Sequence, residues 1–243
     1  MTHLHNLPLQ DLRFYATAPY VCSYLSHKKA RSQVVTPGYI IDRKLYSALV
    51  DQGFRRSGAF VYRPHCDHCH ACVPVRVNVR HFSPNRSQKR AWARHAHMES
   101  RECDLVFREE HYRLYARYQQ CRHLEGPVLQ EGEEQYRHFL LQSSVTTRLV
   151  EFREEGQLRM VSVIDELDQG LSSVYTFYDP DLPGASLGTY SVLWQIREAA
   201  QRGLPWVYLG YWIAESRKMA YKIRFQPLER LKVGHWIPLR PEN

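Results

Sequence analysis

Apolar and polar positions follow different patterns in the two halves of the chain. Between residues 14 and 79, short β-type runs surround one segment, 43–54, in which Leu45, Ala48 and Leu49 recur at helical spacing. A helix among short strands predicts a small α+β unit. The β-type runs are 33–41, 59–64 and 73–79.

After residue 145 the pattern is that of strands separated by turn signals, EEGQ and DQG, and therefore predicts a meander. A helix, a strand, a short helix and a last strand follow. The order β-β-β-α-β-α-β is that of N-acetyltransferase-type (GNAT-like) domains, although order alone is weak evidence. The predicted strands are 147–154, 157–167, 171–179, 205–213 and 228–239, and the predicted helices are 109–123, 131–144, 187–203 and 216–225.

Charge divides the 243-residue chain more sharply than hydrophobicity does. Residues 1–100 carry 15 Lys and Arg against 5 Asp and Glu, whereas 101–243 carry 18 against 20. We therefore expect a basic, Cys-bearing N-terminal region over 1–100, a helical connector over 101–145 and a C-terminal domain over 146–243. Such an asymmetry predicts a polyanionic partner for the N-terminal region.

Composition, with 44% hydrophobic residues, is that of an ordinary globular protein. No apolar run is long enough to span a bilayer, and no leader pattern is apparent near the start. We therefore expect a cytoplasmic protein without a membrane partner, in which thiols stay reduced.

The segment RPHCDHCHACVPVRV, 63–77, places Cys66, Cys69 and Cys72 at three-residue intervals. Three thiols at this spacing suit a structural zinc or an iron–sulfur cluster, and Cys22 is the best candidate for a fourth ligand. Reduced thiols that pack a turn are the alternative. Local substitutes for the fourth ligand are His65, His68 and His70.

Positive charge continues along 76–94, which contains six Arg or Lys and no acid, and HKKARSQ at 27–33 adds more. Arg holds phosphate bidentately, and Phe82 and Trp92 could stack on bases, so a nucleic-acid surface is predicted. A solvated helix end is the alternative. The candidate binding residues are Lys28, Arg31, Arg76, Arg86, Gln88 and Arg90.

Two stretches of the second half also carry candidate chemistry. SLGTYS, 186–191, begins a helix, where free N–H groups favour a phosphate, although a simple cap is the alternative. YLGYWIAESRKMAYKIRF, 208–225, crowds polar side chains at the end of a buried strand, where ligands commonly bind. The candidates are Ser186, Gly188, Thr189, Tyr211, Glu215, Lys218, Tyr221 and Lys222.

Taken together, CSYL, FRRSGAFVYRPHCDHCHACVPVRV, FSPNRSQKR, YTFYDP, SLGTYSVL, YLGYWI and SRKMAYK resemble the bacterial leucyltransferase branch of the arginyl-tRNA–protein transferase family, from about Cys22 to about Pro238. The resemblance implies a Cys-bearing N-terminal region followed by a GNAT-like domain with a central mixed sheet. It also implies transfer of leucine from Leu-tRNA to proteins with N-terminal Asp or Glu, which marks them for N-degron degradation. Eukaryotic relatives space their cysteines differently, and Leu25 stands where a second thiol of their first pair would fall.

No cofactor is expected for this chemistry, because the aminoacyl ester is already activated and positioning should dominate. Our candidates near the amine are Tyr211 and Glu215, with Tyr190 and Lys218 as donors to the carbonyl or the ribose oxygen. An acidic first residue needs a fixed cation, for which the candidates are Arg31, Arg76 and Arg86.

Three alternatives stay open on the sequence. Arginyl transfer would require a buried carboxylate, and Asp165, Glu166 and Asp179 lie near predicted strand ends. A metal-stapled RNA-binding protein without activity would bind tRNA and yield no product. An acetyl-CoA N-acetyltransferase would need a Gly-rich pyrophosphate loop that the sequence lacks.

Overall fold

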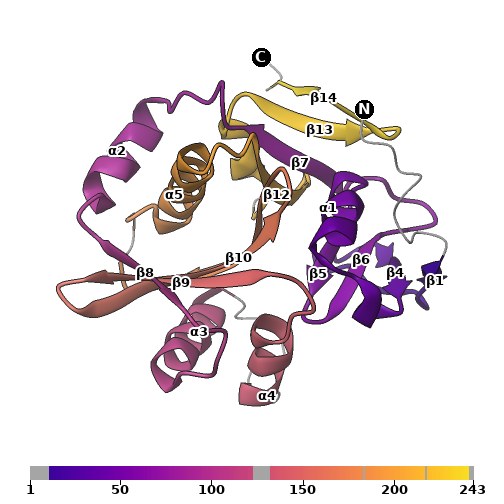
Figure 1. Ribbon diagram of the computed structural model, residues 1–243, viewed down its shortest axis with the longest axis horizontal. Helices are drawn as coiled ribbons and strands as arrows, with labels where there is room; N and C mark the ends of the chain where they lie inside the picture. The colour runs from indigo at the N-terminus through magenta and orange to yellow at the C-terminus, as the bar shows by residue number, and fades with distance from the viewer. Residues whose placement is uncertain (1–10, 123–131, 183, 217, 241–243) are drawn as a thin grey trace.

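The strands form one sheet of eight and one sheet of four, with a two-stranded ribbon beside them (Figure 1). The computed structural model describes residues 11–122, 132–182, 184–216 and 218–240. Among these residues no helix is both long enough and apolar enough to cross a membrane.

The large sheet is mixed and has the strand order β14-β13-β7-β12-β11-β10-β9-β8. Its one parallel pair is β11 with β12, and every other neighbouring pair is antiparallel. The strands are β7 (Val73–Asn78), β8 (Glu99–Cys103), β9 (Thr147–Glu154), β10 (Gln157–Leu167), β11 (Gly170–Tyr178), β12 (Trp206–Trp212), β13 (Leu228–Lys232) and β14 (His235–Leu239).

Strand β7 comes from the predicted N-terminal region, yet it lies between β12 and β13. Val75 and Val77 on one face are 1% and 0% exposed, and Arg76 on the other face is 9% exposed, so the strand is buried on both faces. The sheet therefore takes strands from both sides of residue 100, and the three-part division of the chain remains a prediction.

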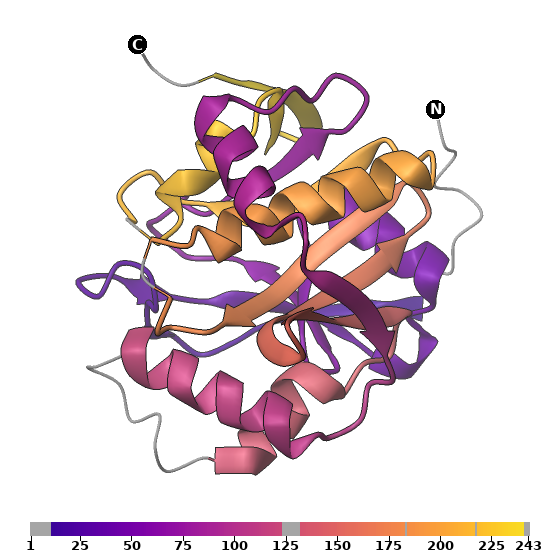
Figure 2. The ribbon, with the colours of Figure 1, turned by 90° about the vertical axis from the view of Figure 1, so that its left-hand side faces the viewer.

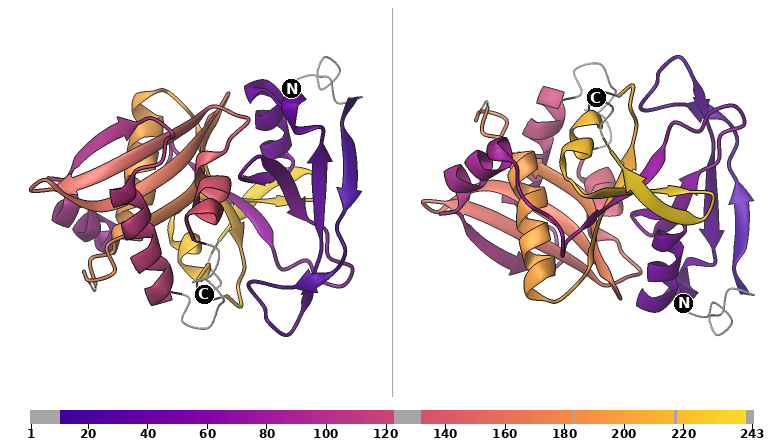
Figure 3. Two further views of the ribbon diagram at one scale, coloured as in Figure 1. Left: turned by 90° about the horizontal axis from the view of Figure 1, so that it is seen from below. Right: turned by 90° about the horizontal axis from the view of Figure 1, so that it is seen from above.

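The small sheet has the order β1-β4-β6-β5 and packs with helix α1 against one end of the large sheet (Figure 3). Asp42 caps α1 by accepting a hydrogen bond from the Leu45 amide, 2.7 Å away. Leu45 and Leu49 of α1 then pack with Leu167 and Tyr208 of the large sheet. The elements are β1 (Arg13–Ala16), β2 (Tyr20–Val21), β3 (Lys29–Ala30), β4 (Ser32–Thr36), η3 (Gly38–Ile40), α1 (Arg43–Asp51), β5 (Arg55–Ser57) and β6 (Phe60–Pro64), with β2 and β3 forming the ribbon.

Helices cover both faces of the large sheet (Figure 2). On one face α5 carries Leu187, Leu193 and Ile196 into the main core, and α2 packs on α5. On the other face α3 and α4 enclose an aromatic cluster around Tyr136. The helices are α2 (Arg86–His95), α3 (Glu109–Arg122), α4 (Gly132–Tyr136), the π-turn η4 (Arg137–Leu141), α5 (Leu187–Gln201) and the 3-10 turn η5 (Ala220–Arg224).

The predicted class, helices and strands with one large mixed sheet, is confirmed. Three details were wrong. Of the described residues in 216–225, only Ala220–Arg224 are helical, as the short 3-10 turn η5. Residues 228–239 form a hairpin that turns at Val233 and Gly234, and Gly38–Ile40, near the end of the predicted β-type run 33–41, form the turn η3. His123 and Glu131, at ends of predicted helices, and Arg217 lie outside the described residues.

Candidate functional site

A cavity of about 320 Å³ opens where the ribbon, the Cys-bearing loop after β6 and the end of β12 meet. The ribbon contributes Tyr20 and Lys29, the loop contributes His65 and His70, and β12 contributes Tyr211. The remaining lining residues are Cys22, Ser23, Tyr24, Leu25, Lys28, Ala30, Arg31, Ser32, Tyr62, Pro64, Cys66, Cys69, Ala71, Cys72 and Ile213.

The polar lining of this cavity is cationic. Lys28, Lys29 and Arg31 line it, and no Asp or Glu does so among the described residues. Arg31 is partly neutralised at the rim, because its guanidinium donates to Asp67 at 3.1 Å and to the Thr17 carbonyl at 3.0 Å. The cavity is therefore suited to an anionic ligand.

All four predicted metal ligands, Cys22, Cys66, Cys69 and Cys72, line this one cavity. Burial and then the other three thiols raise the pKa of Cys72 to about 12, so its thiol is protonated at neutral pH. Within the described ranges no three His, Cys, Asp or Glu side chains are placed to hold a metal ion. As they lie here, the thiols do not fit a metal centre, and the predicted metal clip is not supported.

The parallel strands β11 and β12 separate behind the cavity. They pair only from Gly170 with Trp206 to Ser172 with Tyr208. Beyond that point the register of β12 shifts against β7, and Gly210 takes a left-handed φ of 71°. A bulge with glycine in this conformation bends a strand away from its neighbour.

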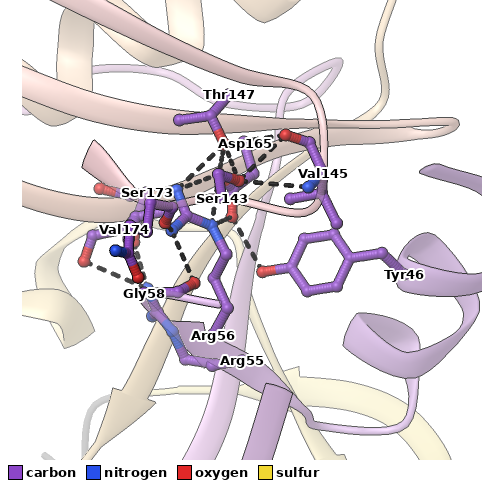
Figure 4. Close-up of polar contacts among 11 residues, drawn as sticks. Tyr46, Arg55, Arg56, Gly58, Ser143, Val145, Thr147, Asp165, Ser173 and Val174 are labelled. Carbon is purple, nitrogen blue, oxygen red and sulfur yellow. Dashed lines mark hydrogen bonds and ion pairs between the residues drawn. The ribbon is translucent and has the colours of Figure 1, made fainter. Parts of the chain in front are cut away.

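The guanidinium of Arg55, from β5, fills the opening between the two strands (Figure 4). Its Nη2 donates to the carbonyl oxygen of Ser173 and, at 3.4 Å, to that of Val174. These carbonyls follow the last residue of β11 that pairs with β12, so Arg55 satisfies acceptors that the separation leaves without a strand partner.

Tyr211 lies between this opening and the cavity, and Lys222 is hydrogen-bonded to it. The Tyr211 hydroxyl donates to the Gly53 carbonyl at 2.9 Å, and Lys222 Nζ donates to the Tyr211 carbonyl at 2.6 Å. Burial and then the charge of Arg55 lower the pKa of Lys222 to about 7. Part of the Lys222 population is therefore neutral at cellular pH.

We predict that position 210 must be glycine to leave room for the guanidinium of Arg55 between β11 and β12. A Cβ at position 210 would lie 1.4 Å from Nη1 of Arg55, so Gly210→Ala must displace the guanidinium and break its hydrogen bonds. We expect a loss of about 2 to 3 kcal/mol in the free energy of unfolding, measured by urea denaturation. The matched control is Gly156→Ala, because Gly156 has a similar φ of 78° but a Cβ at that position would have no neighbour within 4 Å. Equal losses in the two variants would show that Arg55 is not held against Gly210.

The four predicted catalytic residues do not gather in one place. Tyr211 lines the cavity, whereas Tyr190 is 2% exposed in the main core, with its ring 5.3 Å from that of Trp92. Glu215 and Lys218 lie exposed after β12. Only Tyr211 of the four contacts the cavity, and the catalytic roles remain predictions.

The predicted basic residues divide into three environments. Lys28 and Arg31 line the cavity, and Arg86 and Arg90 are exposed on α2. Arg76 is 9% exposed and pairs with Asp51 and Glu229 while its guanidinium lies 3.6 Å from the Trp206 ring centroid. With two carboxylates already bound, Arg76 has little charge left for a ligand.

Gln88, Phe82 and Trp92 have packing roles in the structure. Gln88 completes a capping box with Asn85 and donates to the Arg224 carbonyl at 3.0 Å. Phe82 stacks on Phe225, and Trp92 packs on the main core. The α2 start therefore lies beside η5, which carries Lys222.

Ser186, Gly188 and Thr189 lie at the start of α5, as the sequence indicated. Ser186 takes a left-handed φ of 57° and makes no side-chain cap hydrogen bond. A Cβ on Gly188 would meet Tyr178, the last residue of β11, at 3.5 Å. Tyr221 is 37% exposed on η5. Phosphate binding at this helix start remains a prediction.

Arg55 was not selected as a site residue from the sequence, because two adjacent arginines are typical of a solvent-exposed surface. The signal that could have found it is Gly210, since an isolated glycine inside a strand pattern indicates a bulge or the close approach of another group. Neither residue could be connected to the other, because 155 positions separate them along the chain.

Family models match most of the chain. The model described as "Arginine-tRNA-protein transferase, N terminus" matches residues 20–90, and the one described as "Arginine-tRNA-protein transferase, C terminus" matches residues 110–232.

Curated proteins from several bacteria are also similar over nearly their whole length. An "Aspartate/glutamate leucyltransferase" of Nitrosospira multiformis is 57% identical over 97% of this chain and 94% of its own. A protein of the same name from Chromobacterium violaceum is 52% identical over 97% of this chain and 98% of its own. Among solved structures, the C-terminal domain of a putative lysylphosphatidylglycerol synthetase from Agrobacterium fabrum is 12% identical, with a TM-score of 0.44 over 70% of this chain and 52% of that one.

Proposed function

The chain belongs to the arginine-tRNA-protein transferase family, and from this premise we propose that it transfers leucine from Leu-tRNA to the N-terminal amine of proteins that begin with Asp or Glu. Relatives at 52–57% identity carry the name aspartate/glutamate leucyltransferase. The product would then be marked for N-degron degradation, and the reaction belongs in the cytoplasm, where charged tRNA is made.

The cationic cavity is the single observation that supports an acceptor with an N-terminal Asp or Glu. Lys28, Lys29 and Arg31 line it, and no Asp or Glu lines it within the described part of the chain. A protein N-terminus that begins with Asp or Glu brings a carboxylate, which such a cavity attracts. An acceptor that begins with Lys or Arg would instead be repelled.

The carboxylates of the core support leucine over arginine as the donor. Asp165 is bound by Arg56, Asp179 by Arg117 and Arg159, and Glu166 by Arg202. An arginyl side chain needs a carboxylate that has no other partner, because burying an unpaired guanidinium is costly. The three carboxylates that could have served arginine are all occupied.

A GNAT-like arrangement supports acyl transfer beside β12. The element order β9-β10-β11-α5-β12 and the parallel pair β11/β12, which separates after three residue pairs, give an opening at the centre of the sheet. We propose that the leucyl ester binds in the cavity on the near side of this opening, against Tyr211, because Arg55 fills the opening itself.

The proposed reaction exchanges one bond for another without a cofactor. The amine nitrogen forms a bond to the leucyl carbonyl carbon, the bond from that carbon to the ribose oxygen breaks, and the nitrogen's proton ends on the ribose oxygen. An N-terminal amine has a pKa of about 7.7 to 8.0, so a neutral fraction is available at cellular pH. Positioning the two groups then supplies most of the rate.

The exposed cations of helix α2 support an aminoacyl-tRNA as the donor of leucine. Arg86, Lys89 and Arg90 are exposed on α2, and Gln88 joins the start of this helix to η5, next to the cavity wall. Phosphate contacts of this kind predict binding that weakens as salt increases.

The test incubates the purified protein with labelled Leu-tRNA or Arg-tRNA and peptides that begin with Asp, Glu, Lys or Ala. We expect product only from Leu-tRNA with the Asp and Glu peptides, at a rate at least about 100-fold above the other pairs. Product from Arg-tRNA would reassign the donor. Salt-dependent tRNA binding without any product would favour a non-catalytic RNA-binding protein.

A further inference from the structure

Two cations, Arg55 and Lys222, lie behind Tyr211 without an acidic partner. Lys222 Nζ donates to the Tyr211 carbonyl, and Arg55 Nη2 donates to the carbonyls of Ser173 and Val174. Across the residues that the structure describes, neither side chain forms an ion pair with Asp or Glu. The charge of Arg55, and that of Lys222 when it is protonated, are therefore balanced only by neutral carbonyl oxygens.

This lack of partners contrasts with the other inward-facing arginines. Arg56 is paired with Asp165, Arg76 with Asp51 and Glu229. Holding a charge away from water without an opposite charge is unfavourable. Lys222 is 6% exposed, and its burial together with the nearby charge of Arg55 leaves part of its population neutral at cellular pH. An anion bound beside Arg55 would therefore be attracted by Arg55 and would favour the charged form of Lys222.

The two cations are close to the cavity. Tyr211 lines the cavity and also lines a small recess with Arg55 and Gly210. Burial raises the pKa of Tyr62, another cavity residue, and the charge of Arg55 opposes that rise. All hydrogen bonds of Arg55 in the described part of the chain come from Nη2, and Nη1 packs against Gly210, so Nε retains its donor for a ligand.

We infer that Arg55, with Lys222 behind it, binds the side-chain carboxylate of the acceptor's N-terminal Asp or Glu. This inference rests on the proposed function and names the residues that determine its acceptor specificity. A guanidinium matches a carboxylate in shape and charge. A tRNA phosphate fits the site less well, because the nucleotides on either side of it need more room than Arg55 has behind Tyr211, whereas Lys28 and Lys29 line the cavity itself.

The experiment compares Arg55→Gln with the wild-type protein on peptides that begin with Asp or with Asn, at a fixed Leu-tRNA concentration. We expect kcat/KM for the Asp peptide to fall at least about 100-fold, toward the value for the Asn peptide, because a buried charge contact is lost. The Asn value should change less than about threefold. Leu-tRNA binding, measured by filter retention, should stay within about twofold of wild type.

The matched control is Arg63→Gln, because Arg63 lies on the neighbouring strand β6, contacts Gln33 and the Phe54 ring, and does not line the cavity. It should leave the Asp-to-Asn ratio of kcat/KM unchanged. Arg55→Lys should restore part of the ratio, because it keeps the charge. Where thermal melting shows that Arg55→Gln does not fold, Lys222→Met is measured in its place and should lower the same ratio.

Two results would overturn the inference. An unchanged Asp-to-Asn ratio in both Arg55→Gln and Lys222→Met would mean that these cations do not read the carboxylate. Weakened Leu-tRNA binding with the ratio preserved would reassign Arg55 to a phosphate. Failure of the proposed function looks different, because the wild-type protein itself would then give no product with any peptide.

Discussion

Asp165→Asn is expected to lower the free energy of unfolding by about 3 to 5 kcal/mol, because it leaves the guanidinium of Arg56 buried without a counter-charge. Both side chains are fully buried, and Arg56 donates to Asp165 through Nε and Nη2 at 2.7 to 2.9 Å (Figure 4). Tyr46 and Thr147 donate to the same carboxylate at 2.9 and 2.8 Å. Urea denaturation at pH 7 measures the loss.

The double variant Arg56→Leu/Asp165→Leu distinguishes the free-energy cost of leaving Arg56 unpaired from the cost of losing the ion pair. Removing both charges avoids the unpaired one, so the double variant should be more stable than Asp165→Asn. Glu133→Gln is the surface control, because Glu133 pairs with Arg137 at an exposed site and should cost less than about 1 kcal/mol. A loss below about 1 kcal/mol for Asp165→Asn would contradict the burial of the Arg56–Asp165 pair.

This buried network also connects the structure to the proposed reaction. Arg56 comes from β5 and Tyr46 from α1, whereas Thr147 and Asp165 come from β9 and β10, so the carboxylate of Asp165 joins the small sheet to the large one. Arg55 is the next residue to Arg56, and it enters the opening between β11 and β12. Loosening the network should therefore displace Arg55 and reduce transfer as well as stability.

Local patterns in the sequence predicted the elements of the second half closely. The meander strands 147–154 and 157–167 have the predicted bounds, because their turns carry Gly156 and Gly170 and their apolar residues fill two buried faces. The hairpin at Val233 and Gly234 was missed, since a single Val-Gly pair gives little turn signal. Local patterns cannot show which strands pair, so the position of β7 inside the large sheet was not predictable.

The candidate site was predictable only in part, for a related reason. The end of β12 was selected from its crowded polar residues, and Tyr211 does line the cavity. Tyr190 is a tyrosine like Tyr211 but lies in the core, because helix α5 directs its side chain toward Trp92 and Phe152. Whether a tyrosine meets a ligand or a core depends on packing between distant segments, which one sequence does not display.

Acid should weaken the fold through Glu151. Burial alone would raise the pKa of Glu151, but hydrogen bonds from Arg153 and His111, at 3.1 and 3.0 Å, lower it to about 2. An unfolded Glu has a pKa near 4.3, so the unfolded chain binds this proton more readily. The stabilisation is therefore complete above about pH 5 and is lost as the pH falls toward 2. Allowing for solvent around Arg153, we expect a loss of about 2 kcal/mol.

Glu151→Gln isolates this contribution. Urea denaturation of the variant and of the wild-type protein at pH 7, 5, 4 and 3 should give a stability difference that is largest at pH 7 and shrinks by about 1 kcal/mol by pH 3, about half of the full loss. Glu109→Gln is the control, because Glu109 pairs with Arg113 on the exposed face of α3 and should leave the pH dependence unchanged. Burial also lowers the pKa of His111, so its protonation adds a further loss below about pH 6.5. A constant difference between Glu151→Gln and wild type across this range would mean that Glu151 is not held by Arg153 and His111 in solution.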